Sequence, residues 1–183
     1  MKWTRAVLAG MAMAGVTALI FVGGCTSTST RADLVVESVN NGGPFFSDLI
    51  NEADTAKVFI PVDKVVVRFA NRPHDGSAAV EPGTGFSEII VTSYTVTYNN
   101  GIYSPVSGGM NLIVPSGGTA EGAITISNLA DKAALPLSTA VTSVAAISFT
   151  GYLRSSGAWG DAVGASAQLT VQVANFGDSN TNP

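Results

Sequence analysis

Alternating apolar and polar residues recur along the chain from residue 33 onward, and they predict β-strands. The clearest alternation lies at 165–173, where every second residue is apolar and the residues between are Ser, Gln or Thr. A period of two places one set on each face of a sheet. The predicted strands are 33–39, 63–71, 87–98, 112–114, 119–127, 141–153 and 165–176.

Turn-forming residues separate these strands. Segments 40–44, 99–101 and 115–118 are rich in Asn, Gly and Pro, which favour turns. One further short strand is expected at 57–60, and one helical turn within 128–136. Because several short strands occur without a long amphipathic helix, the pattern predicts an all-β fold. We expect a two-layer antiparallel, immunoglobulin-like β-sandwich of about seven strands.

The apolar sets of these strands predict the core. In strand 87–98 we expect Ile90 to share a face with Tyr94 and Val96, with Thr95 and Thr97 on the opposite face. The other residues expected to face inward are Leu34, Val36, Val65, Val67, Phe69, Ile124, Ile126, Ile147, Phe149, Ala167, Leu169, Val171 and Val173.

The N-terminal segment has a different pattern. Lys2 and Arg5 precede an uncharged stretch at 6–22, and small residues follow it. A positive start, an apolar middle and a small exit are typical of a secretory signal. The alternative is a permanent transmembrane helix, but the apolar stretch is at the lower length limit for crossing a bilayer and contains two glycines.

The exit sequence Val22-Gly23-Gly24-Cys25 resembles the lipobox of bacterial lipoproteins. In that family the signal is removed before the cysteine, whose thiol carries a diacylglyceryl group, and the new amino end is usually acylated. The resemblance implies a cleaved signal peptide at 1–24, a lipidated Cys25 and a membrane anchor. Because Thr26 rather than Asp follows, it also implies the outer membrane if the cell has one. The alternative for Cys25 is a free thiol.

Three further segments resemble a group of bacterial lipoproteins of unassigned function. These are Ser-Tyr-Thr-Val-Thr-Tyr at 93–98, the Asn-Asn-Gly turn that follows it, and the closing segment 173–178. The motifs are structural, so the resemblance implies an envelope-anchored β domain and no particular activity. The expected organisation is a flexible tether at 25–32, a sandwich domain at 33–176 and a disordered tail at 177–183.

Composition narrows the chemistry. Removing Lys2 and Arg5 with the signal leaves 7 basic against 13 acidic residues, a net charge of −6, and no basic cluster. Nucleic acid is therefore an unexpected partner, because phosphate binding needs several cationic contacts. The single cysteine allows no intramolecular disulfide. One histidine, His74, cannot supply a zinc site, and no cofactor is expected.

Few residues are candidates for catalysis or binding. His74 lies in a Pro-His-Asp-Gly turn, which favours a surface histidine over a triad base, and no Gly-x-Ser-x-Gly motif is present. The acidic side chains at 48–54 could converge on calcium, although their spacing is not that of a calcium loop. Tyr103 and Trp159 are aromatic residues in expected loops. The candidate binding residues are Asp48, Glu52, Asp54, Tyr103 and Trp159.

Strand parity predicts which loops share an end of the sandwich. Loops 70–85, 115–118 and 154–164 should lie at the tethered end, and segments 40–62, 99–110 and 128–140 at the far end. The leading hypothesis is a non-catalytic, membrane-anchored lipoprotein that serves as a structural or protein-interaction module with an envelope partner. The alternative is a carbohydrate- or calcium-binding module, and a hydrolase using carboxylates alone is a third hypothesis.

Overall fold

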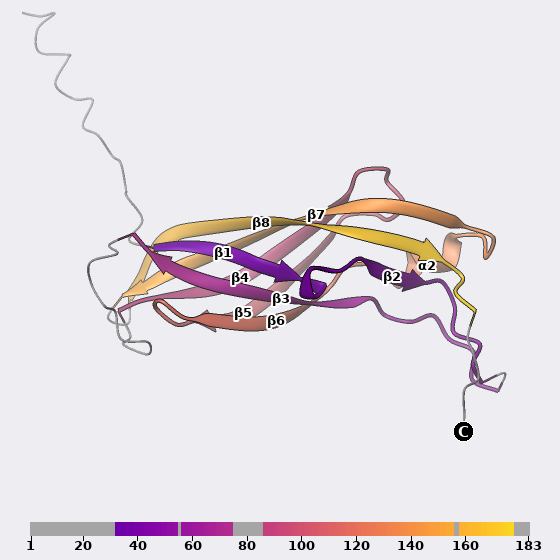
Figure 1. Ribbon diagram of the computed structural model, residues 1–183, viewed down its shortest axis with the longest axis horizontal. Helices are drawn as coiled ribbons and strands as arrows, with labels where there is room; N and C mark the ends of the chain where they lie inside the picture. The colour runs from indigo at the N-terminus through magenta and orange to yellow at the C-terminus, as the bar shows by residue number, and fades with distance from the viewer. Residues whose placement is uncertain (1–31, 55, 75–85, 156–157, 178–183) are drawn as a thin grey trace, which may run out of the picture.

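The computed structural model describes residues 32–177, except 55, 75–85 and 156–157 (Figure 1). The sequence predictions for the signal peptide, for Cys25 and for residues 178–183 lie outside the described residues. The regular secondary structure of the described chain is almost entirely β-strand, in two sheets that pack against each other. The predicted all-β sandwich is confirmed.

The strands range from 4 to 17 residues in length, and the described residues include one short α-helix. The elements are β1 (Ala32–Val39), the 3₁₀ turn η1 (Asn40–Gly42), β2 (Phe45–Asp48), β3 (Lys64–Pro73), β4 (Phe86–Tyr98), β5 (Val106–Val114), β6 (Thr119–Thr125), α2 (Leu129–Ala134), β7 (Ala140–Ser155) and β8 (Ala158–Ala174). In the described residues, no helix is both long and apolar enough to cross a bilayer.

The two sheets have three and five strands. Sheet A has the order β1-β3-β6, and sheet B has the order β2-β8-β7-β4-β5. Every pair is antiparallel except β2 with β8, which is parallel. This order places β6 beside β3 in one sheet and β7 between β8 and β4 in the other, as in immunoglobulin-like sandwiches. The expectation of a purely antiparallel sandwich is therefore wrong at β2.

The additional strand lies at a different place from the one predicted. It is β2, whereas in the predicted segment 57–60 only an isolated bridge forms, between Asn51 and Phe59. The chain steps from sheet A to sheet B through η1, where Asn40, Asn41 and Gly42 all have positive φ. Asn and Gly tolerate this conformation better than other residues do. β1 and β2 thus act as one strand divided between two sheets.

Two predicted strands are longer than the sequence suggested. β5 begins at Val106 rather than at 112, because Gly108 continues the strand instead of ending it. A Cβ at Gly108 would lie 2.5 Å from the Tyr94 ring, so the glycine makes room for a neighbouring aromatic side chain. β8 begins at Ala158 rather than at 165, and Trp159 pairs with Arg154. Trp159 is therefore on a strand and not in a loop.

The core lies between the sheets and contains most of the expected residues. The buried set includes Val65, Val67, Phe69, Ile124, Ile126, Ile147, Phe149, Leu169, Val171 and Val173. The expectation for Ile90 is wrong, because the β4 register shifts between Val91 and Ser93. Such a bulge reverses which residues face inward. Ile89 and Val91 face the core before it, and Tyr94 and Val96 after it.

The sandwich has two distinct ends. At the near end, Ala32 pairs with Pro73 and Phe86 pairs with Ser155. The far end holds α2 and the segment between β2 and β3, which extends away from the sheets (Figure 1). Among the described residues, turn 115–118 lies at the near end and connections 49–63, 99–105 and 126–139 lie at the far end, as strand parity predicted. Segment 40–44 was expected at the far end, but it lies along the sandwich between β1 and β2. Residues 75–85 and 156–157 lie outside the described residues.

Candidate functional site

A buried group of polar side chains lies at the far end between the two sheets. We call it the lysine–aspartate cluster, and its members are Ser47, Asp63, Tyr103, Ser127 and Lys132. The Lys132 side chain is 0% exposed and that of Asp63 is 3% exposed. Charged side chains are almost never this buried unless they are paired. The cluster is therefore the part of the described chain where the buried side chains differ most from those of an ordinary hydrophobic core.

Asp63 accepts hydrogen bonds on both carboxylate oxygens. Oδ1 lies 2.9 Å from the Lys132 Nζ, and Oδ2 accepts from the Ser47 and Ser127 hydroxyls at 2.6 Å each. Since the single Ser47 proton points to Asp63, the Tyr103 hydroxyl donates to the Ser47 Oγ at 2.8 Å. These short contacts with a charged group are the stronger kind of hydrogen bond.

Lys132 also donates to the main chain. Its Nζ lies 2.8 Å from the Pro61 carbonyl oxygen. Pro61 and Asp63 are in the segment that leads into β3, so one lysine holds two points of that segment. A buried ion pair is destabilising unless its geometry is good and its remaining valences are filled. In this cluster the buried Asp63 carboxylate accepts hydrogen bonds from three donors, which meets that condition.

The elements that carry the cluster have local reasons for their positions. The Asn128 side chain accepts from the Ala130 N–H at 2.9 Å and so caps α2, which places Lys132 in the second half of that short helix. The Ile126 N–H donates to the Asp63 carbonyl oxygen at 3.0 Å. β2 turns Ser47 inward while Phe46 faces solvent. Segments distant in the sequence are thereby joined at one point.

Two tyrosines extend this polar group. Their rings meet edge to face with centroids 5.2 Å apart, and the Tyr98 hydroxyl donates to the Ile126 carbonyl oxygen at 2.7 Å. Burial raises the pKa of Tyr103 to about 12, and nearby Asp63 and Asp131 also raise it. Burial, followed by the charges of Tyr103 and Asp63, raises the pKa of Tyr98 well above its usual value. Both phenols are therefore held in the neutral form.

The candidate binding carboxylates do not converge. Asp48 accepts from the Phe176 N–H at 3.1 Å, and Asp54 accepts from the Ala56 N–H at 3.0 Å. Glu52 is exposed. The part of the chain that the structure describes contains no group of three or more His, Cys, Asp or Glu side chains placed to hold a metal ion. Asp48 thus holds the end of the described chain, and Asp54 closes a local backbone turn.

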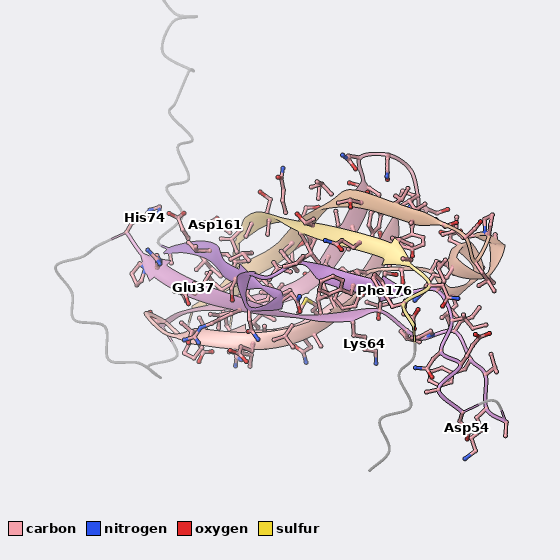
Figure 2. The ribbon with its side chains drawn as sticks, turned by 45° about the vertical axis from the view of Figure 1, so that its right-hand side comes forward. Glu37, Asp54, Lys64, His74, Asp161 and Phe176 are labelled. Carbon is pink, nitrogen blue, oxygen red and sulfur yellow. The ribbon has the colours of Figure 1, made fainter. Side chains whose placement is uncertain are left out.

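The remaining candidates lie in three different places. Tyr103 is only 2% exposed, so it belongs to the interior rather than to a ligand-facing loop. Trp159 lies near the opposite end, where β7 passes into β8. His74 is exposed, with its Nε2 2.7 Å from the Asp33 Oδ2. Figure 2 shows His74 at one end of the molecule and Asp54 at the other.

Sequence reasoning did not single out the residues of the lysine–aspartate cluster other than Tyr103. Lys132 directly follows Asp131, and Asp63 directly precedes Lys64 at the start of a strand. Because each has an oppositely charged neighbour in the sequence, no local signal marks either residue as buried. Their pairing across a separation of 69 residues could not be predicted from the sequence.

Exposed apolar side chains gather at the far end. Phe46 and Phe59 are each 56% exposed, and Val58, Val62, Leu129 and Leu137 are about half exposed. Val62 and Leu129 line a groove of about 450 Å³ together with Pro105 and Val106. Exposed apolar groups that gather in one region often mark a binding surface. We call the side chains of Val58, Phe59, Val62 and Leu129 the far-end apolar group.

No protein-family model matches the chain, and no curated protein matches it significantly. Function is therefore inferred from the residues and from their arrangement in the sandwich.

Proposed function

We propose that the protein is a lipid-anchored envelope protein whose sandwich acts as a non-catalytic interaction module. Cys25 carries the anchor, and the region beyond it presents the far end of the domain to a partner protein. The observation that carries this proposal is the lipobox-like sequence at 22–25 behind an apolar signal-like stretch. Lipidation with more than one acyl chain gives stable membrane attachment.

The arrangement of the domain supports this role. The first described residue, Ala32, lies at the near end, seven positions after Cys25. The far-end apolar group lies at the opposite end of the strands. An anchored domain that enters at one end leaves the other end accessible to partners. A surface rich in exposed aromatic and aliphatic side chains suits protein–protein contact.

The anchor is tested by fractionation and by mass spectrometry of the full chain. Wild-type protein should partition with membranes and yield an N-terminal peptide that begins at Cys25 and carries acyl groups. The Cys25→Ala variant should appear in the soluble fraction with its fold intact by circular dichroism. A wild-type protein that retains residues 1–24 and an unmodified thiol would overturn the proposal.

The interaction surface is tested separately by site-specific photo-crosslinking in the native cell. A photoreactive residue at Val58 or Val62 should yield a discrete adduct with one envelope protein. Val66 on sheet A is a matched control, because it is 44% exposed, against 49% for Val58 and Val62. The adduct should be lost in a Phe59→Ser background. Equal adducts from Val66, or none from either far-end position, would contradict an interaction role for this end.

A further inference from the structure

The lysine–aspartate cluster holds an amine and a carboxyl group in contact in a buried interior. We propose that Lys132 and Asp63 join through an intramolecular amide bond between Nζ and Cγ, formed in the folded chain without another reactant. The two groups already lie in contact, with the Lys132 Nζ 2.9 Å from the Asp63 Oδ1. This inference concerns only described residues and is independent of the lipid anchor.

The number of hydrogen-bond partners fits an amide better than an ammonium ion. An ammonium carries three protons, and the described residues offer the Lys132 Nζ two acceptors, the Pro61 carbonyl and the Asp63 Oδ1. After bond formation the nitrogen keeps one proton, and the Pro61 carbonyl, which lies 2.8 Å from the unreacted Nζ, is available to accept it. The cluster therefore satisfies the product completely and the ammonium ion incompletely.

The oxygen that stays in the product is also provided for. The Asp63 Oδ2 accepts from the hydroxyls of Ser47 and Ser127, and it becomes the amide carbonyl oxygen. During the reaction the same two hydroxyls stabilise the negative charge that develops on Oδ2, in the manner of an oxyanion hole. The Tyr103 hydroxyl donates to the Ser47 Oγ and strengthens that donor.

The reaction is a dehydration with balanced atoms and charges. The ammonium first transfers a proton to the Asp63 Oδ1, giving a neutral amine and a carboxylic acid. Nζ then attacks Cγ to form a C–N bond, with the negative charge on Oδ2. A second proton passes from Nζ to the Oδ1 hydroxyl, the C–Oδ1 bond breaks, and one water molecule leaves. Nothing is oxidised or reduced.

Physical conditions in the cluster favour this step. Removing two opposite charges from a water-excluded interior relieves the desolvation cost that a buried ion pair carries. Two reacting groups held in contact by a fold behave as if they were at very high concentration. A bond between residues 63 and 132 would also restrict the unfolded chain, as a disulfide does. With one cysteine, the sequence has no disulfide of its own to supply this restriction.

Mass spectrometry of the denatured full-length chain tests the proposal directly. The mass of the wild-type protein should be lower by one water molecule than the mass expected from its sequence and processing. The Lys132→Arg variant should have its full expected mass. Trypsin should leave Lys132 uncut and join its peptide to peptide 58–64. A free 58–64 peptide and a full-mass wild-type chain would overturn the proposal, and this result does not depend on whether any variant folds.

Matched variants then identify the chemistry. Asp63→Asn should give the same linked product as wild type, because its side chain releases ammonia instead of water. Ser127→Ala should leave a measurable fraction of unlinked chain in freshly made protein, because Oδ2 loses one donor. Asp63→Ala should be fully unlinked. Linkage in Asp63→Ala, or its persistence in Lys132→Arg, would show that the bond joins other residues and would contradict this assignment.

Discussion

The molecule holds two groups of opposite charges in very different surroundings. On the outer face of sheet A, Arg68 contacts Glu37 at 3.1 Å and Glu121 at 3.7 Å, and Arg72 contacts Glu37 at 3.5 Å. In the lysine–aspartate cluster, Lys132 contacts Asp63 at 2.9 Å. The distances are similar. The exposure is not, because the Arg68 side chain is 49% exposed and that of Lys132 is 0% exposed.

This difference shows that contact distance alone does not determine what an ion pair contributes. Water and salt screen the pairs on sheet A, and exposed pairs of this kind typically contribute about 0.2–1 kcal/mol. As long as it is unreacted, the buried pair cannot be screened, so neither partner can lose the other without leaving a charge in an apolar interior. The surface pairs therefore contribute little to stability, whereas the buried pair joins the segments that meet at the far end.

Removing the buried lysine should have the largest effect on stability. Lys132→Met should destabilise the domain by at least about 3–5 kcal/mol, because Asp63 remains buried as a charge without its partner and the proposed amide bond cannot form. Urea unfolding followed by circular dichroism measures this change. The double variant Asp63→Leu/Lys132→Met should recover part of the loss, since no charge is then stranded. A double variant no more stable than the single one would contradict this explanation.

Removing one hydroxyl donor should have an intermediate effect. In chains whose Lys132 and Asp63 are unlinked, Ser127→Ala should cost about 1.5–3 kcal/mol, the usual range for a hydrogen bond to a charged group. The Ser107→Ala variant is a suitable control, because that hydroxyl pairs with the exposed Thr95 side chain at 3.3 Å. The control should change the unfolding midpoint little. Equal losses in the two variants would mean that burial of the partner charge is not the deciding factor.

The pH dependence of stability at alkaline pH should further distinguish the buried cluster from the surface ion pairs. The folded-state pKa of Tyr103 is about 12, above its ordinary value of about 10, so the folded state binds the phenol proton more tightly. Its contribution is complete below pH 10 and declines as the pH rises from about 10 to about 12. Tyr103→Phe should cost about 0.5–1.5 kcal/mol at neutral pH.

That variant should also flatten the alkaline decline, which the unfolding free energy measured at a series of pH values would reveal. An unchanged decline would assign it to Tyr98 or to other groups instead.

The smallest effect is expected on the surface of sheet A. Arg68→Met should change stability by about 0.2–1 kcal/mol, and the change should shrink further in high salt. It is the same cation-to-Met replacement as in the buried pair. A loss from Arg68→Met as large as that from Lys132→Met would remove the distinction between the two groups of charges.

Much of the sandwich could be predicted from the sequence because burial of one sheet face imposes a period of two. β3, β7 and β8 show this period directly, so their inward residues were correct. The pattern failed at Ile90, because a bulge changes the period without an obvious sequence signal. It failed at β2 because four residues that pair in parallel with a distant strand are too few to show a period.

The lysine–aspartate cluster was not predictable for a different reason. Ser47, Asp63, Ser127 and Lys132 come from separate segments, and each is ordinary in its own local sequence. Their meeting depends on how the strands are ordered in two sheets. Tyr103 was noticed only as an aromatic residue in an expected loop, because its hydroxyl contact with Ser47 depends on the same tertiary arrangement.

The divided strand has a mechanical consequence. β1 runs from the near end and is hydrogen-bonded to β3, and β2 continues in the same direction along β8. A pull on Ala32 resisted at the far end would load both ladders lengthwise, so that their bonds share the force and must rupture together. A domain of this design would resist tension from its attachment point far better than a hairpin that can be peeled open one bond at a time.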